Sequence, residues 1–158
     1  MTAIVLLSGG LDSAVTAMIA ADRDSDIHAV VFDYNQPELA YQIAKKIHAQ
    51  TVDTVSLPWL DSSMPMRNAT MMMIGASFAD KYQAEYIYHW ASESEPYHDC
   101  RREVFFSLQN AIMSGSEDAY PIIKTPLMDM TKLEIRGKAE LFGLLNTRTG
   151  IYQHMAIC

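Results

Sequence analysis

A buried strand that runs directly into a glycine turn and a helix constrains this chain more than any other feature. Residues 3–13 read Ala-Ile-Val-Leu-Leu-Ser-Gly-Gly-Leu-Asp-Ser. Because Gly9 and Gly10 lack a Cβ, the backbone can turn sharply and present its N–H groups to an anion. A helix that begins near Leu11 adds about half a positive charge at its N-terminus. The segment predicts a phosphate-binding strand–turn–helix unit, against the alternative of an ordinary joint capped by Ser and Asp.

The side chains of this turn, which we call the glycine loop (residues 8–13), strengthen that prediction. Ser8 and Ser13 carry hydroxyls that can donate hydrogen bonds to phosphate oxygens. Asp12 would repel a phosphate unless a cation lay between them, so the loop predicts a pyrophosphate site with Mg²⁺ held at Asp12. The loop is not a Walker A motif, because no Gly-Lys-Ser/Thr follows, and it lacks the Gly-x-Gly-x-x-Gly of a dinucleotide fingerprint.

Composition favours a single cytoplasmic domain that spans residues 1–158. Hydrophobic residues make up 49% and charged residues 20%, as in ordinary globular proteins. We expect no membrane association, since no apolar run reaches about 18 residues and no signal peptide precedes the first strand. The two cysteines, Cys100 and Cys158, are too few for a disulfide framework and fit a reducing compartment. A net charge of −7 without a basic cluster argues against a nucleic-acid partner.

Apolar runs alternate with amphipathic stretches of helix length, which predicts an α/β fold with a parallel sheet. We expect right-handed crossovers and therefore a doubly wound, Rossmann-like sheet of five strands. Ligands bind such sheets beyond the carboxyl ends of the strands. The expected strands span about 3–7, 27–33, 51–57, 85–90 and 121–125, and the expected helices about 11–22, 37–49, 67–82, 99–114 and 131–142.

Polar residues follow the second and third strands. The segment from Phe32 to Gln36 predicts adenine recognition by the backbone near Phe32, with Gln36 near the nucleotide or acceptor; the alternative is a strand end with turn-forming residues. Arg67 at a helix start opposes the macrodipole, which favours a nearby anionic ligand. Asn68 is either a substrate contact or simply the N-cap of that helix.

The segment after the fourth strand, residues 89–102, gathers aromatic, His and Arg side chains. Arginine forks match carboxylates and aromatic faces stack on heterocycles, so this segment predicts a pocket for a flat polar ring. Asp99 and Arg101 open the fourth helix, where Asp99 is also a candidate cap. His89 and His98 are weak evidence for a metal.

Thr125 and Lys132 follow the fifth strand. Thr131 and Glu134 fit a capping box, which accounts for both residues without any function. Lys132 lies in the first helical turn, where a positive charge is unfavourable unless it contacts an anion such as phosphate.

The glycine loop resembles the PP-loop of the ATP pyrophosphatase superfamily, whose pattern is Ser-Gly-Gly-x-Asp-Ser. The resemblance implies an adenine nucleotide alpha hydrolase-like fold. Enzymes of this superfamily cleave ATP between the α and β phosphates and transfer AMP to a carboxylate or carbonyl-type oxygen. A nitrogen or sulfur nucleophile then displaces the AMP.

Five blocks in order resemble one family of this superfamily, the 7-cyano-7-deazaguanine synthases of queuosine biosynthesis. The resemblance implies an ATP-dependent C–N ligase that converts 7-carboxy-7-deazaguanine and ammonia to the nitrile through an adenylated intermediate, with ATP and Mg²⁺ as cofactors. The blocks are the glycine loop, Phe32 to Gln36, Arg67-Asn68, Asp99-Cys100-Arg101, and Thr125-Pro126-Leu127 with Lys132 and Glu134.

The resemblance also implies roles for individual residues. Asp12, Lys132 and Arg101 are the expected catalytic residues, and Asp12 would face Mg²⁺. The expected ATP-binding residues are Ser8, Gly9, Gly10, Leu11, Asp12, Ser13, Phe32 and Arg67. The expected substrate-binding residues are Gln36, Asn68, Asp99, Arg101 and Thr125.

Two departures from the family pattern leave alternatives open. The family binds zinc through four cysteines near the C-terminus, but the matching positions here are Gly150, Tyr152, Met155 and Cys158, so we expect no zinc. The loops after Gln36 and Leu57 are also shorter than those of the family.

The alternatives are a diverged PP-loop enzyme that adenylates or amidates another acceptor, and a nucleotide-binding module without turnover. The sequence does not determine the oligomeric state, and a homodimer is left open.

Overall fold

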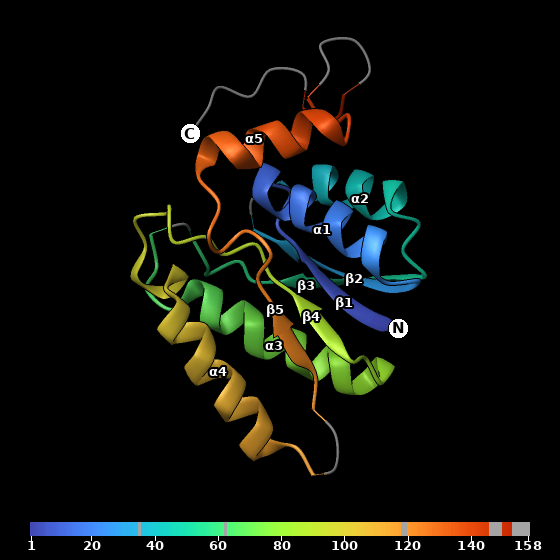
Figure 1. Ribbon diagram of the computed structural model, residues 1–158. Helices are drawn as coiled ribbons and strands as arrows, with labels where there is room; N and C mark the ends of the chain where they lie inside the picture. The colour runs from blue at the N-terminus through green and yellow to red at the C-terminus, as the bar shows by residue number, and fades with distance from the viewer. Residues whose placement is uncertain (35, 62, 118–119, 146–149, 153–158) are drawn as a thin grey trace.

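The computed structural model describes residues 1–34, 36–61, 63–117, 120–145 and 150–152. Its centre is a five-stranded parallel sheet in the order β3-β2-β1-β4-β5 (Figure 1). The predicted α/β fold with a doubly wound parallel sheet is thereby confirmed. The strands are β1 (Thr2–Leu7), β2 (Asp26–Asp33), β3 (Thr51–Ser56), β4 (Tyr86–Tyr88) and β5 (Ile122–Lys124).

Helices cover both faces of the sheet. The helices on one face are α1 (Leu11–Arg23), α2 (Pro37–Lys46) and α5 (Lys132–Leu141), and those on the other face are α3 (Arg67–Tyr82) and α4 (Arg102–Gly115) (Figure 1). Alternate residues of a strand point to opposite faces. Accordingly, Val5 and Leu7 pack in the core beneath α1 and α5, whereas Ile4 and Leu6 pack with Met71 of α3.

Strand β2 is buried on both faces, as expected of a central parallel strand. Val30, Val31 and Phe32 are all fully buried. At the sheet edge, β3 instead alternates between partly buried and exposed residues. The polar residues that follow β2 therefore start from a rigid, fully packed strand.

The start of α5 agrees with the sequence prediction, but the start of α4 differs from it. A capping box of Thr131 and Glu134 begins α5, as the sequence predicts. The expected start of α4 at Asp99 is wrong: residues 98–100 form a 3₁₀ turn, Arg101 is extended, and α4 begins at Arg102. The cause is that the Asp99 carboxylate accepts hydrogen bonds from Asn68 instead of capping its own helix.

The chain order of the strands reverses between β1 and β4. From β1 the chain moves outward through β2 and β3, and it then returns to β4 on the other side of β1. Loops that leave neighbouring strands in opposite directions open a crevice at the carboxyl ends of those strands. The described helices include none that is both long and apolar enough to cross a membrane.

Candidate active site

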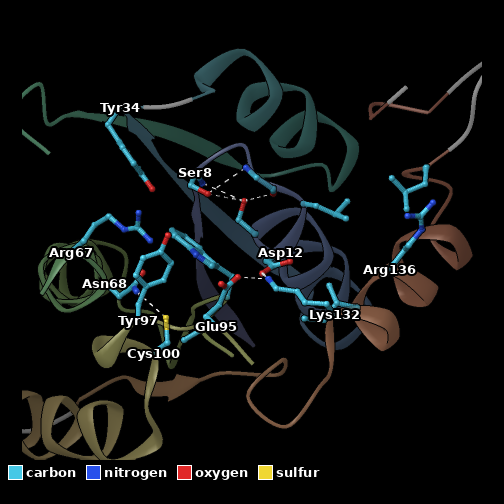
Figure 2. Close-up of a pocket in the computed structure, with 17 residues that line it drawn as sticks. Ser8, Asp12, Tyr34, Arg67, Asn68, Glu95, Tyr97, Cys100, Lys132 and Arg136 are labelled. Carbon is cyan, nitrogen blue, oxygen red and sulfur yellow. Dashed lines mark hydrogen bonds and ion pairs between the residues drawn. The ribbon is translucent and has the colours of Figure 1, made fainter. Parts of the chain in front are cut away.

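A cavity of about 310 Å³ lies in this crevice, at the carboxyl ends of β1 and β4 (Figure 2). Its wall combines the glycine loop, the start of α3, the loop after β4 and the first turn of α5. The described lining residues are Ser8, Gly10, Leu11, Asp12, Ser13, Tyr34, Arg67, Asn68, Trp90, Ala91, Glu95, Tyr97, Cys100, Lys132, Ile135, Arg136 and Leu145.

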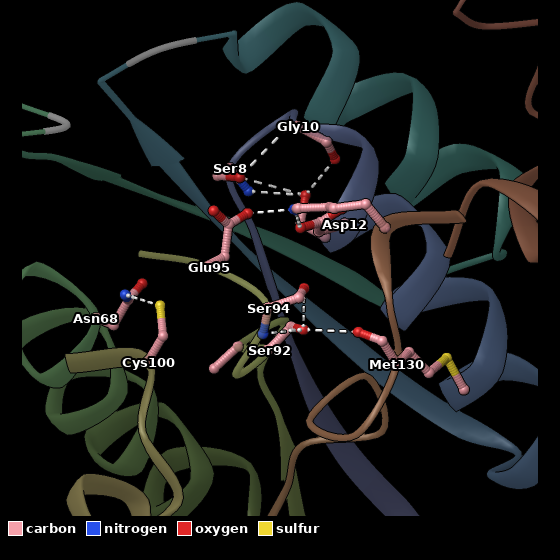
Figure 3. A network of polar contacts seen from close by, with 12 residues as sticks. Ser8, Gly10, Asp12, Asn68, Ser92, Ser94, Glu95, Cys100 and Met130 are labelled. Atoms are coloured by element: carbon pink, nitrogen blue, oxygen red, sulfur yellow. Dashed lines mark hydrogen bonds and ion pairs between the residues drawn. The ribbon is translucent and has the colours of Figure 1, made fainter. Parts of the chain in front are cut away.

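The glycine loop forms one end of the cavity, and its first glycine is required by its geometry. Gly9 has a φ of +86°, and a Cβ on it would lie 2.0 Å from the carbonyl oxygen of Gln36. Both serines brace the turn: Ser13 Oγ donates to the Gly10 carbonyl at 2.9 Å, and Ser8 Oγ accepts from the Gly10 N–H at 3.4 Å (Figure 3). The long bond leaves the Gly10 N–H weakly engaged and able to turn to an anion.

One ammonium group forms ion pairs with two acidic side chains beside this loop. Lys132 Nζ donates to Asp12 Oδ2 at 2.7 Å and also contacts Glu95 (Figure 2). Burial raises the pKa of Asp12, and the hydrogen bond from Lys132 offsets this only in part. Burial lowers the pKa of Lys132, but its hydrogen bonds to Asp12 and Glu95 outweigh burial and raise the pKa overall. Lys132 therefore keeps its positive charge between the two acidic side chains.

Buried contacts tie together the two loops that carry these residues. Ser92, which is fully buried, donates to the Met130 carbonyl at 3.0 Å (Figure 3). The Glu93 N–H donates to the Met128 carbonyl at 3.1 Å. The loop after β4, with Glu95, is thereby fixed to the loop before Lys132.

Aromatic and polar side chains form the other end of the cavity. The Arg67 guanidinium lies 5.2 Å from the centre of the Tyr97 ring, and Tyr34 and Trp90 complete the wall. Asn68 donates to Asp99 Oδ1 at 3.1 Å and contacts Cys100 Sγ at 3.2 Å. Three buried atoms in this region have no partner among the described residues, namely Arg67 Nε, Asn68 Oδ1 and His89 Nε2.

Burial shifts the pKa of three other groups in this region in the direction that favours the neutral form. Burial raises the pKa of Cys100 to about 11, so this thiol is not a nucleophile at neutral pH. Burial, aided by the charge of Arg67, lowers the pKa of His89 to about 3. Burial also raises the pKa of Tyr34. This end of the cavity therefore offers Arg67 as its cation among neutral rings and amides.

The structure brings some of the predicted site residues into the cavity and leaves others outside its lining. Arg101 donates instead to the Glu93 carbonyl at 2.8 Å, and Asp99 accepts from the Asn68 N–H at 2.7 Å. The interpretation of Asn68 as an N-cap is wrong, because Met66 holds that position. The predicted residues that line the cavity are Ser8, Gly10, Leu11, Asp12, Ser13, Arg67, Asn68 and Lys132. Those outside its described lining are Gly9, Phe32, Gln36, Asp99, Arg101 and Thr125, whose roles stay predictions.

Sequence reasoning missed several residues of the site. Arg136 lies one turn after Lys132 on the same helix face, so the i, i+4 spacing could have revealed it. Glu95 and Tyr34 lie within segments that the sequence places at the site, but the sequence assigns neither residue a role of its own. Tyr152 was matched only to a zinc position, yet its hydroxyl donates to the Gly9 carbonyl at 2.8 Å.

The described residues do not fit a zinc site at the chain end. Gly150 has no side-chain donor, and the hydroxyl of Tyr152 is bound to Gly9. Met155 and Cys158 lie outside the described residues. Within the described ranges, no three His, Cys, Asp or Glu side chains gather to hold a metal. The absence of zinc stays a prediction.

Comparison with known proteins identifies the family. A model described as queuosine biosynthesis protein QueC matches residues 2–63 and 44–156. The chain belongs to this family. A 7-cyano-7-deazaguanine synthase of Methanospirillum hungatei is 32% identical, over 85% of this chain and 77% of the relative. One of Nitratiruptor sp. is 30% identical, over 85% of this chain and 76% of the relative. The family predicted from the five sequence blocks is confirmed.

The QueC match also bears on the predicted loop differences. It consists of two segments that overlap at residues 44–63, a stretch that includes β3 and ends in the loop after it. This is one of the two places where the sequence predicts a loop shorter than the family's.

Solved structures share the fold of this QueC-family chain. A 4-thiouridine synthetase in complex with RNA and ATP aligns with a TM-score of 0.65 at 21% identity, over 90% of this chain and 40% of that one. The U34-tRNA thiolase NcsA of Methanococcus maripaludis aligns with a TM-score of 0.64 at 12% identity, over 99% of this chain and 62% of that one. At these identities the likeness establishes the architecture alone.

Proposed function

We propose that the chain is an ATP-dependent 7-cyano-7-deazaguanine synthase, which converts 7-carboxy-7-deazaguanine and ammonia to the nitrile. The observation that carries this proposal is a single cavity with a phosphate-binding glycine loop at one end and a ring-binding wall at the other. The relatives named for this activity support the same substrate. An intact loop with its lysine favours turnover over a nucleotide-binding module without catalysis.

The loop end of the cavity suits the phosphates of ATP. The N-terminus of α1 lies at the cavity, where the Gly10 N–H has a long bond of 3.4 Å to Ser8 Oγ, and Lys132 and Arg136 add positive side chains. Asp12 and Glu95 already hold one cation between them, the Lys132 ammonium, and their hard oxygens suit Mg²⁺. Bound at these oxygens, Mg²⁺ would neutralise charge on the leaving pyrophosphate.

The opposite end suits a planar heterocycle that carries a carboxylate. Tyr34, Trp90 and Tyr97 supply faces for stacking. No described residue pairs with the buried Arg67 Nε, which can donate to the carboxylate, or with the buried Asn68 Oδ1, which can accept from a ring N–H. Asp99 fixes the orientation of Asn68 through two hydrogen bonds.

In the proposed reaction the substrate carboxylate attacks the α-phosphorus of ATP and pyrophosphate leaves. Ammonia attacks the resulting acyl adenylate and expels AMP, which gives the amide. The amide oxygen is adenylated by a second ATP, and loss of AMP with both amide protons leaves the nitrile. Lys132 and the loop N–H groups stabilise the negative charge that builds on the departing pyrophosphate in each activation.

Mass spectrometry of a reaction with ATP, Mg²⁺, ammonium and 7-carboxy-7-deazaguanine tests this function. The expected products are the nitrile, AMP and pyrophosphate. Lys132→Ala should abolish them, whereas Ser107→Ala, which removes an exposed hydroxyl on α4, should leave them unchanged. AMP formed only with a different heterocyclic acid would identify another acceptor. Bound ATP without any AMP would show a module without turnover.

A further inference from the structure

Tyr152 contacts the glycine loop and lies outside the described lining of the cavity. It is 4% exposed, and its ring packs in the hydrophobic core that also holds Leu144. Its hydroxyl donates to the Gly9 carbonyl at 2.8 Å and lies 3.3 Å from the Gly10 carbonyl. Its own N–H donates to the Leu144 carbonyl at 3.1 Å, so the ring is held at both ends.

This hydrogen bond acts on the part of the loop that a phosphate must meet. A peptide unit is planar and trans, so the N–H of Gly10 points away from the Gly9 carbonyl oxygen. Fixing that oxygen therefore fixes the direction of the Gly10 N–H. On the other side, this N–H has only a long bond of 3.4 Å to Ser8 Oγ. Gly9 itself adopts a φ of +86°, where glycine has wide conformational freedom.

We propose that Tyr152 is a positioning residue for nucleotide binding, which holds the Gly9–Gly10 peptide with its N–H directed to the phosphates. The position matches a zinc-binding cysteine in the family pattern, and here a phenol joins the segment after α5 to the loop. The ATP part of this inference rests on the proposed function. The loop geometry is a property of the protein without ligand.

Tyr152→Phe tests the inference because it removes the hydroxyl and keeps the ring. Tyr88→Phe is the matched control: Tyr88 is also buried, and its hydroxyl donates to Asp24 at the opposite end of α1, at 2.7 Å. The measurements are ATP affinity by calorimetry, thermal unfolding, and the amide signals of Gly10 and Leu11 in ¹H–¹⁵N spectra without ligand.

We expect Tyr152→Phe to weaken ATP binding roughly 2- to 10-fold, which is the range that one net hydrogen bond provides. The Gly10 and Leu11 amide signals should move in this variant and stay in place in Tyr88→Phe. Tyr88→Phe should unfold at a lower temperature yet bind ATP as the wild type does.

Unchanged ATP affinity together with unmoved amide signals in Tyr152→Phe would overturn the proposal and leave Tyr152 a structural core residue. Equal losses of ATP affinity in both variants would also overturn it, because general destabilisation would then explain the effect. A wild-type protein that binds no ATP would refute the proposed function, and the amide signals would still decide whether Tyr152 orients the loop.

Discussion

Replacing Gly9 by alanine tests most directly how the loop is built. The new Cβ would lie 2.0 Å from the Gln36 carbonyl oxygen and 2.8 Å from its carbonyl carbon. Both atoms belong to backbone, so the clash cannot be relieved by turning a flexible side chain. The φ of +86° adds strain for any residue with a Cβ.

Two contributions set the size of the effect. The positive φ costs about 1–2 kcal/mol for a residue other than glycine. Moving backbone to relieve overpacking adds about 1–3 kcal/mol. The sum, about 2–5 kcal/mol, is a large part of the 5–15 kcal/mol that typically separates a folded domain from its unfolded chain. Any relaxation must also displace the loop or the β2–α2 connection beside the cavity, so ATP-dependent pyrophosphate release should be lost.

Two other glycines separate these contributions. Gly143 has a φ of +68° but open space around its Cβ position. Gly143→Ala should therefore lower the free energy of unfolding only by the conformational strain of the positive φ. Gly137 lies inside α5 with open space, so Gly137→Ala should stabilise the protein by about 0.5–1 kcal/mol. Both variants should release pyrophosphate as the wild type does.

Urea unfolding and a pyrophosphate-release assay on the three variants provide the check. The expected order of stability is Gly137→Ala above wild type, then Gly143→Ala, with Gly9→Ala lowest. If Gly9→Ala unfolds at the same urea concentration as Gly143→Ala and still releases pyrophosphate, the clash is relieved without loss of function. The argument from loop geometry is then refuted.

Three further predictions follow from charge, capping and burial. Burial raises the pKa of Asp12 above its unfolded value of 3.8, so the stability that this group contributes falls as the pH rises above 3.8. Asp12→Asn should release no pyrophosphate, and its melting temperature relative to the wild type should be higher at about pH 7 than near pH 4; a pH-independent difference would contradict the raised pKa. Thr131→Ala removes the capping box of α5 and should lower stability by about 0.5–2 kcal/mol in urea unfolding, with wild-type stability contradicting the cap. In a Cys158→Ser background, Cys100 should resist iodoacetamide at pH 8 until the protein unfolds, since burial raises its pKa to about 11; rapid labelling of the folded protein would contradict this burial.

The sequence predicts every strand and helix of the sheet layers because each is encoded locally. The apolar runs and the capping box of Thr131 and Glu134 need no information from elsewhere in the chain. The predicted start of α4 is wrong because it depends on a contact with a residue far away in the sequence. Asp99 looks like a cap within its own segment, but it pairs with Asn68, 31 residues earlier.

The residues of the candidate site also fall into two groups, those that the local sequence identifies and those that only tertiary contacts bring together. The glycine loop can be identified from six consecutive residues, and Arg67 and Lys132 from their unfavourable places at helix starts. Glu95 meets Lys132 across 37 residues, and Tyr152 meets Gly9 across 143. Neither contact leaves a periodicity or motif, because only the packed tertiary structure brings these residues together.

The bond between Lys132 and Asp12 has a consequence for synthesis on the ribosome. The two residues are 120 positions apart, so Asp12 and Glu95 are made long before the ammonium that they share. A nascent chain that has formed β1 to β4 holds two carboxylates at one crevice without that counter-charge. Arrival of α5 supplies it, so this helix both closes the hydrophobic core over α1 and removes this repulsion. We therefore expect the phosphate site to mature only after α5 has docked.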